Sequence, residues 1–206
     1  MFTSIYTVCD EKTFSDLLSK AEIIEEDGHG LKVLLLENGN YLKLFRIKHL
    51  VSSARIYNPA KRFRDNAKKL AAFGIDTVRV TQLYSIPHLQ RWGAEYEPLQ
   101  GEVLSAIIEQ GTFNEERQTS LVDFVLALHE QGIYFRSLHA GNIVLTPTQH
   151  WGLIDILDCR FGRGELPKGK RQRNLQHLFR YENIKPFRKK IEQLYWNTKV
   201  QATTTR

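Results

Sequence analysis

The sequence predicts an α+β protein built from two lobes, a β-rich N-terminal lobe with one helix and a mostly helical C-terminal lobe. Two patterns favour this class: three short β-prone runs fill much of the first third of the chain, whereas helical periodicity dominates beyond residue 102. A third observation is the polar connector EYEPLQGE between them, which contains Pro98 and Gly101. We therefore expect an N-terminal lobe over 1–95 and a C-terminal lobe over 96–206.

Two glycine-containing turns divide the β-prone runs of the first lobe. DGHG (27–30) lies between the first and second runs, and NGN (38–40) lies between the second and third. Asn-Gly is a strong hairpin signal, because both central positions of a type I′ turn need positive φ. The third run, YLKLF, places Lys43 in the middle of a strand. Gly28 and Gly30 would let the first turn approach a ligand closely, and an ordinary hairpin is the alternative.

A helix is expected to follow the third run. Asn58 is a good N-cap, Pro59 suits the first helical position and Gly74 can end the helix. Apolar residues at helical spacing predict its buried face, which comprises Phe63, Ala67, Leu70 and either Phe73 or Ala71. The following run, TVRVTQLY, is typical of a strand.

The second lobe begins with two predicted helices, VLSAIIEQG and EERQTSLVDFVLALHEQG. The inner face of the longer helix is expected to hold Leu121, Phe124, Val125 and Leu128. NIVLT and GLIDI are predicted short strands. The tail is predicted to be helical, with an interruption at Pro186.

Positive charge is concentrated in two blocks. The chain carries +6 overall, but 43–69 carries +8 and 160–206 carries +10, which leaves −12 for the remainder. Such blocks indicate an anionic partner, such as nucleotide, phosphorylated glycan, lipid head groups or nucleic acid, and solvated helix faces are the alternative. The sequence contains no helix-turn-helix, RNA-binding or zinc signature, so nucleic acid is not expected.

Other compositional features predict a cytoplasmic protein. No apolar run approaches the roughly 18 residues of a membrane span, and the N-terminus lacks the pattern of a secretion signal. Cys9 and Cys159 match no metal or redox spacing, which favours two reduced thiols.

Three motifs supply, in order, the groups that phosphoryl transfer needs. Those groups are a cation for the nucleotide phosphates, oxygen ligands for a metal, and a group that orients or deprotonates the attacking hydroxyl. Protein kinases provide them as a strand lysine, H-R-D-L-x-x-x-N and D-F-G. Here Lys43 follows the Asn-Gly hairpin, and FRSLHAGN matches the second motif with Ser137 in place of the aspartate and Asn142 in register. LIDIL then places Asp155 at the end of an apolar run.

On these residues the chain resembles the lipopolysaccharide kinase family, small bacterial members of the protein-kinase-like superfamily that include Kdo and heptose kinases and toluene-tolerance proteins. The resemblance covers about 22–181 and is strongest over GIYFRSLHAGNIVL, WGLIDILD and RQRNLQHLFRY. LHAGN is also similar to the L-H-P-G-N of aminoglycoside and choline kinases. The resemblance implies a small bilobal protein-kinase-like fold that binds ATP and Mg²⁺ between its lobes.

For the nucleotide, the resemblance implies roles for five residues of the first lobe and the connector. Lys43 would contact the α- and β-phosphates, and Gly28 and Gly30 would border the turn that covers them. Backbone groups from Glu97 to Leu99 would bind the adenine edge. An exposed strand lysine is the alternative for Lys43.

For the metal, the resemblance implies Asn142 and Asp155, which both offer the hard oxygen atoms that suit Mg²⁺. A buried, unpaired Asp155 would be costly, so the sequence itself demands a metal or an arginine partner there. Asn142 as a turn cap is the alternative. The usual glutamate partner of the strand lysine is missing, and RFRDNAKKL offers Asp65 or Asn66 instead.

The largest departure from the family pattern is Ser137, which occupies the position of the catalytic base. A serine hydroxyl cannot act as a general base near pH 7, and loss of such a group typically costs roughly 10²–10⁴ in rate. Asp158, His139 or the substrate itself would then orient the acceptor hydroxyl. The structural alternatives are that Asp158 pairs with Arg136 or Arg160 and that His139 is a hydrogen-bonded loop residue.

Three functions follow from these patterns. The first is an ATP-dependent kinase acting on a lipopolysaccharide core sugar, with its basic segments KGKRQR and FRKK in peripheral contact with an anionic glycolipid at the inner membrane. The second is a catalytically impaired pseudokinase that regulates envelope or solvent tolerance. The third, from a different class, is a nucleic-acid-binding protein.

Overall fold

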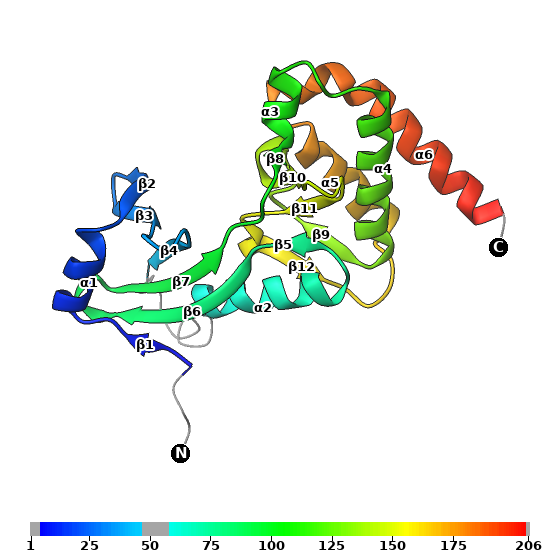
Figure 1. Cartoon of the computed structure of the whole chain (residues 1–206). Coiled ribbons are helices and arrows are strands. Elements are labelled where there is room, and N and C mark those ends of the chain that lie inside the picture. Colours follow the sequence, from blue (N-terminus) through cyan, green and yellow to red (C-terminus); the bar gives the residue numbers. More distant parts are fainter. Residues whose placement is uncertain (1–4, 47–57, 205–206) are drawn as a thin grey trace. The chain divides into compact units, whose positions relative to one another are not determined.

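A computed structural model describes residues 5–46 and 58–204, with side chains placed as far as residue 199 (Figure 1). The chain forms two compact units. The first consists of the described parts of Met1–Ala72 together with Thr77–Pro98, and the second consists of Phe73–Asp76 together with the described part of Leu99–Arg206. The first unit is built mainly from strands and the second mainly from helices, so the predicted α+β class is confirmed.

A six-stranded sheet forms most of the first unit, with the order β1-β6-β7-β4-β3-β2. All of its neighbouring strands are antiparallel except β1 and β6. Its strands are β1 (Thr7–Val8), β2 (Glu22–Asp27), β3 (Gly30–Leu35), β4 (Tyr41–Arg46), β6 (Arg79–Ile86) and β7 (Arg91–Glu97). Both predicted hairpins are present, because β2 pairs with β3 and β3 pairs with β4.

The core of this sheet lies beneath helix α1 (Glu11–Leu18), which the sequence analysis did not predict. Phe14 of the helix packs with Leu34, Leu42 and Ile86 from three strands. Gly93 of β7 allows the side chain of Leu42 to pack close to the β7 backbone, because a Cβ at Gly93 would lie 3.0 Å from Cδ1 of Leu42. A short 3-10 helix, η1 (Pro87–Leu89), joins β6 to β7.

Helix α2 (Pro59–Ala72) begins and ends as the sequence predicts. The Oδ1 atom of Asn58 accepts hydrogen bonds from the backbone N–H groups of Ala60 at 2.9 Å and Lys61 at 3.1 Å. Gly74 after the helix has a φ of 73°. The buried face differs in one detail, because neither Ala71 nor Phe73 is buried and the stripe ends one turn earlier.

The connector in the structure is shorter than the predicted EYEPLQGE. Strand β7 continues through Glu97, so only 98–101 lies outside regular structure before β8 (Glu102–Val103). Glu95 is therefore a strand residue and is buried, with an exposed fraction of 8%. The sequence pattern missed this because three glutamates, a proline and a glycine in eight residues are typical of a loop.

The second unit contains two small sheets and a group of helices. The sheets have the orders β5-β11-β10-β8 and β12-β9. Its remaining strands are β5 (Asp76–Thr77), at the boundary between the units, β9 (Ile133–Phe135), β10 (Ile143–Leu145), β11 (Trp151–Leu153) and β12 (Cys159–Phe161). Its helices are α3 (Leu104–Glu109), α4 (Glu115–Glu130), η2 (Ala140–Asn142), η3 (Ile156–Asp158), α5 (Lys168–Leu178), η4 (Glu182–Phe187) and α6 (Arg188–Thr204).

Helix α4 packs against α6 (Figure 1). Asn114 caps α4 by accepting a hydrogen bond from the backbone N–H of Arg117 at 3.0 Å. Leu121, Val125 and Leu128 are buried as predicted, but Phe124 is only half-buried. Of the helices in the described part of the chain, none is long and apolar enough to cross a membrane.

Candidate functional site

Ser137, in the loop where the kinase pattern places its catalytic base, is paired with Asp158 at the end of η3. The hydroxyl of Ser137 donates a hydrogen bond to Oδ2 of Asp158 at 2.6 Å, and the backbone N–H of Ser137 donates to Oδ1 at 3.3 Å. The Nε atom of Arg136 lies 3.4 Å from the same carboxylate, whose side chain is 22% exposed. The expected pairing of Asp158 with Arg136 is therefore present. A carboxylate lies directly beside the position where the family pattern has one.

Asn142 is buried at the end of the same loop. Its Nδ2 atom donates to the backbone carbonyl of Ser137 at 3.1 Å and lies 3.1 Å from Nε2 of His139. Its own backbone carbonyl accepts a hydrogen bond from Ile154 at 3.0 Å, which joins the loop to the end of β11. Because Nδ2 is engaged in these contacts, Oδ1 is the atom that Asn142 offers to a cation.

Asp155 differs from the sequence expectation in its surroundings. Strand β11 ends at Leu153, and Asp155 is an exposed residue in the left-handed region, with a φ of 49°. The argument that burial demands a metal or arginine partner is therefore wrong. Asn142 and Asp155 still supply the amide and carboxylate oxygens that Mg²⁺ prefers, so their chemistry fits this ion. The described residues include no cluster of three His, Cys, Asp or Glu side chains that could hold a metal.

His139 is a neutral imidazole at pH 7. Burial lowers its pKa below the usual value, the charge of Asp155 opposes this, and the charge of Arg180 lowers the pKa further. Its Nε2 atom faces the amide nitrogen of Asn142, which must donate, so the hydrogen-bond network assigns the proton to Nδ1. Nδ1 is buried and has no hydrogen-bond partner within the part of the chain that the structure describes. The ring packs on Tyr181, with centroids 4.6 Å apart.

A buried hydrogen-bond network supports the strand that precedes the candidate loop. His129 of α4 lies between Tyr195 of α6, with Nδ1 2.6 Å from the hydroxyl, and Asn174 of α5, with Nε2 3.0 Å from Oδ1. The Nδ2 atom of Asn174 donates to the carbonyl of Phe135 at 2.6 Å, two residues before Ser137. Burial is the main cause that lowers the pKa of His129 to about 4. Three helices are thus tied to the strand that leads into the loop.

Arg171 completes this network. It is 2% exposed and donates to the Tyr195 hydroxyl at 3.2 Å, the carbonyl of Leu166 at 2.7 Å and the carboxylate of Glu165 at 2.8 Å. The sequence analysis placed Arg171 in KGKRQR, the segment expected to contact an anionic glycolipid, and this prediction is wrong for Arg171 because its side chain is buried. Asn174 was given no role, although both residues belong to RQRNLQHLFRY. The available signal was their spacing of three residues, which places both on one helix face.

In the first unit, Lys43 is a residue of β4, opposite Val33 on one side and Ala94 on the other. Its Nζ atom lies 5.9 Å from the ring centroid of Phe63 in α2. Of the two proposed partners, Asp65 forms ion pairs with its helix neighbours Lys61 and Arg64. Asn66 is buried in α2, with an exposed fraction of 5%.

Gly28 and Gly30 form the β2–β3 turn as expected. Gly30 has a φ of 97°, and a Cβ at either glycine would meet no atom within 4 Å. The turn is closed by Asp27, whose Oδ1 accepts a hydrogen bond from the backbone of His29 at 2.8 Å. Space therefore remains beside both glycines.

The two connector residues proposed for the adenine have separate environments. Glu97 ends β7 and forms an ion pair with Arg79 of β6. Leu99 packs on Gly152 of β11, because a Cβ at that glycine would lie 2.5 Å from Cδ2 of Leu99. The glycine is thus required for this close contact.

Glu95 is a polar centre of the first unit that sequence reasoning did not single out. Its carboxylate accepts hydrogen bonds from the amides of Asn38 at 3.0 Å and Asn40 at 2.7 Å and from the hydroxyl of Tyr84 at 2.8 Å. Burial alone would raise the pKa of Glu95, but these hydrogen bonds outweigh it and hold the pKa below the usual value. Glu95 therefore fixes both asparagines of the predicted Asn-Gly turn.

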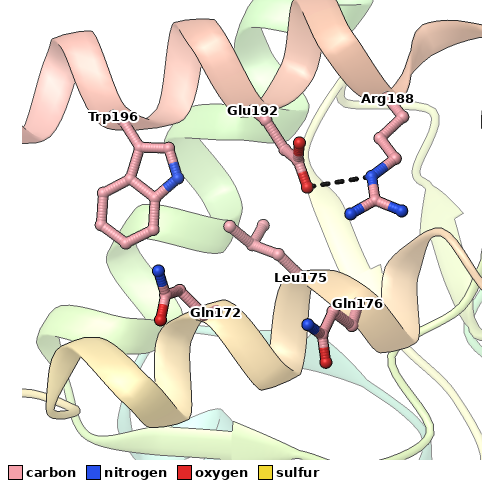
Figure 2. Close-up of a pocket in the computed structure, with 6 residues that line it drawn as sticks. All are labelled: Gln172, Leu175, Gln176, Arg188, Glu192 and Trp196. Carbon is pink, nitrogen blue, oxygen red and sulfur yellow. Dashed lines mark hydrogen bonds and ion pairs between the residues drawn. The ribbon is translucent and has the colours of Figure 1, made fainter.

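A pocket of about 310 Å³ lies between α5 and α6 of the second unit (Figure 2). Figure 2 shows Trp196 and the ion pair of Glu192 with Arg188 on α6, facing the side chains that α5 contributes. None of the residues that the sequence predicts for the site lines it. The lining residues are Gln172, Leu175, Gln176, Arg188, Glu192 and Trp196.

Comparisons with known proteins leave the family of the chain open. No protein-family model matches the sequence, and no curated protein matches it. Among solved structures, the chain is similar to the bifunctional kinase-methyltransferase WbdD, with 21% identity and a TM-score of 0.45. The aligned region covers 66% of this chain and 32% of the WbdD chain.

Proposed function

We propose that the protein is a kinase-like phosphotransferase that uses Mg-ATP to phosphorylate a sugar of the lipopolysaccharide core at the cytoplasmic face of the inner membrane. The observation that supports this function is the Ser137–Asp158 hydrogen bond, beside the buried amide of Asn142. The pair restores a carboxylate to a loop whose sequence has lost one. The family resemblance supplies the nucleotide, the metal and the sugar acceptor.

In the proposed reaction, Asp158 orients the acceptor hydroxyl and receives its proton through Ser137. The acceptor oxygen forms a bond to the γ-phosphorus, the bond from that phosphorus to the bridging oxygen of ADP breaks, and the proton passes to Oδ2 of Asp158. Bound Mg²⁺ would neutralise charge on the phosphates. Positioning by Ser137 and Asn142 suits this chemistry, because the transition state is loose and needs little covalent assistance.

Asp158→Asn tests the proposal. We expect the wild type to gain thermal stability with Mg-ATP and to release ADP when core oligosaccharide is added. Asp158→Asn should keep the stabilisation by Mg-ATP but lose about 10²-fold or more in ADP release. Asp155→Ala and Lys43→Ala should lose the stabilisation itself. Asp123→Asn, an exposed aspartate of α4, is the matched control. A wild type that Mg-ATP does not stabilise would refute the function.

The pseudokinase is the second candidate, and one observation favours it. Ser137 has a hydroxyl that already donates its proton to Asp158, so the base position itself has no carboxylate to act as a general base. A protein that binds Mg-ATP but releases no ADP with any core oligosaccharide, in the wild type and in Ser137→Asp alike, would be a nucleotide-dependent regulator. A gain in turnover in Ser137→Asp would instead show that the remaining site is competent.

A further inference from the structure

Basic side chains gather beside the candidate loop on the second unit, within RQRNLQHLFRY. Arg173 and His177 are four residues apart on α5 and therefore share a face of the helix. Arg180 follows one turn later, and its backbone N–H donates to the carbonyl of His177 at 3.2 Å. Both arginines are exposed. The end of α5 and the turn that follows it thus carry two arginines and a histidine.

The β9–β12 ribbon brings two more arginines to the same place. The hydroxyl of Tyr134 lies 3.4 Å from Nε2 of His177, which joins β9 to α5. Arg160 of β12 is the direct cross-strand partner of Tyr134, so their side chains emerge on one face of the ribbon. Arg136 lies two residues beyond Tyr134 and contacts Asp158. We call Arg136, Arg160, Arg173 and Arg180 the arginine cluster.

The electrostatics at His177 show that positive charge prevails there. Burial is the largest cause that lowers the pKa of His177, and the charges of Arg173, Arg180 and Arg136 lower it further. Only the charge of Asp158 acts in the opposite direction among the groups that influence this histidine. That carboxylate is ion-paired with Arg136 at 3.4 Å, so it offsets one of the four positive charges and leaves the cluster with a positive excess.

We propose that the arginine cluster binds a phosphomonoester carried by the acceptor sugar and so orients the acceptor beside the Ser137–Asp158 pair. The proposal rests on the proposed function and names its acceptor class, a sugar that already bears a phosphate. Guanidinium groups suit this ligand because they bind phosphate oxygens in a bidentate, planar manner.

Calorimetric titration with glucose 6-phosphate and with glucose tests the proposal on the full chain. We expect the phosphorylated sugar to bind at least ten-fold more tightly than glucose. Arg173→Ala and Arg180→Ala should each weaken its binding about ten-fold, because each removes a charge-assisted hydrogen bond. Lys12→Ala, which removes one exposed positive charge from α1, is the matched control and should leave binding unchanged. Equal binding of the two sugars would overturn the proposal.

NMR of His177 tests whether the phosphorylated sugar binds at the arginine cluster. Bound phosphate would offset the arginine charges, so the pKa of His177, followed by NMR, should rise when glucose 6-phosphate is added. The groups that face this imidazole are Tyr134, Arg136, Asp158, Arg173 and Arg180. An unchanged pKa for His177 at saturating glucose 6-phosphate would place the sugar elsewhere and overturn the proposal.

Two further arms separate the alternatives. Vesicles containing phosphatidic acid test for a lipid phosphate, and binding to vesicles without binding to glucose 6-phosphate would overturn the proposal. Stabilisation by Mg-ATP should be unchanged in Arg173→Ala; its loss would assign the cluster to the nucleotide and also overturn the proposal. If the arginine cluster binds glucose 6-phosphate but Mg-ATP does not stabilise the protein, the proposed kinase function is refuted and the phosphate site stands.

Discussion

The hydrogen bond between Ser137 and Asp158 gives the serine a structural role besides any role in chemistry. Because the carboxylate is mostly buried, removal of the donor leaves it poorly solvated. We expect Ser137→Ala to lower the free energy of unfolding by about 1.5–3 kcal/mol, the usual range for a hydrogen bond to a charged group. Thermal unfolding measures this, with Ser105→Ala of α3 as control. Equal melting temperatures for the two variants would contradict the hydrogen bond.

Glu95 gives a prediction for the first unit at the same scale. Its lowered pKa means that the ionised carboxylate stabilises the fold above its ordinary pKa, and that this contribution disappears as pH falls through the folded-state pKa. Glu95→Gln should therefore melt below the wild type at pH 7, and the two melting temperatures should converge as the pH falls below the folded-state pKa of Glu95. A difference that persists unchanged in acid would show that packing rather than charge is responsible.

The order of Lys43, Ser137, Asn142 and Asp155 was readable from the sequence because these residues lie at fixed spacings from turns and apolar runs. Their roles remain predictions. The environment of Asp155 was not readable, since the left-handed turn after Leu153 exposes a residue whose neighbours in sequence are apolar. Asp158 appeared in the sequence only as a candidate, because its contact with Ser137 spans 21 residues.

At the scale of elements, helices α4, α5 and α6 meet at the buried hydrogen-bond network. Tyr195→Phe would leave His129 and Arg171 each without one hydrogen-bond partner while keeping the ring in place. Buried groups left unpaired cost about 1–3 kcal/mol, so the melting temperature should fall by several degrees. Trp196→Phe, at the neighbouring position of α6, is the control for a change of aromatic residue. Wild-type stability in Tyr195→Phe would show that the network is dispensable.

The same network makes stability depend on pH. His129 is neutral in the folded state, with a pKa of about 4, whereas an unfolded histidine titrates near 6.5. The free energy of unfolding is therefore greatest above pH 6.5. It falls by up to roughly 3 kcal/mol as the pH falls toward 4, because only the unfolded chain binds the proton readily. Between pH 7.5 and 5, His129→Gln should show a shallower decline than the wild type. Parallel declines would refute this assignment.

Elements with strong local signals were predicted correctly, and those that depend on tertiary packing were missed. The Asn-Gly turn and the Asn58 cap predicted their hairpin and helix. Strand β7 was missed because WGAEYE carries charges and a glycine, although the glycine is what lets Leu42 approach. The short helix α1 was missed because its stability depends largely on burying Phe14 against the sheet.

At the scale of the whole molecule, the +10 block near the C-terminus governs long-range attraction. We expect the protein to sediment with vesicles of anionic lipid at low salt and to be released at about 0.5 M NaCl, because screening shortens the range of exposed charges. Lys168→Glu with Lys170→Glu, two exposed positions of α5, should release it at lower salt. Retention in high salt would indicate apolar insertion instead.

The two-unit organisation was predictable because strand-type and helix-type patterns occupy separate halves of the chain. The observed units differ from the predicted lobes at their boundary. Four residues from the end of the α2 region, Phe73–Asp76, belong with the helical unit, and no local pattern marks such a transfer.

The carbonyl of Phe135 accepts a hydrogen bond from Asn174, which His129 joins to Tyr195, so a residue of α6 helps to position the candidate loop. A premature stop codon or proteolytic nick shortly before that tyrosine would spare every residue of the candidate loop. It would nevertheless remove the hydrogen bonds that support the loop, and so have the same effect as a substitution within the loop.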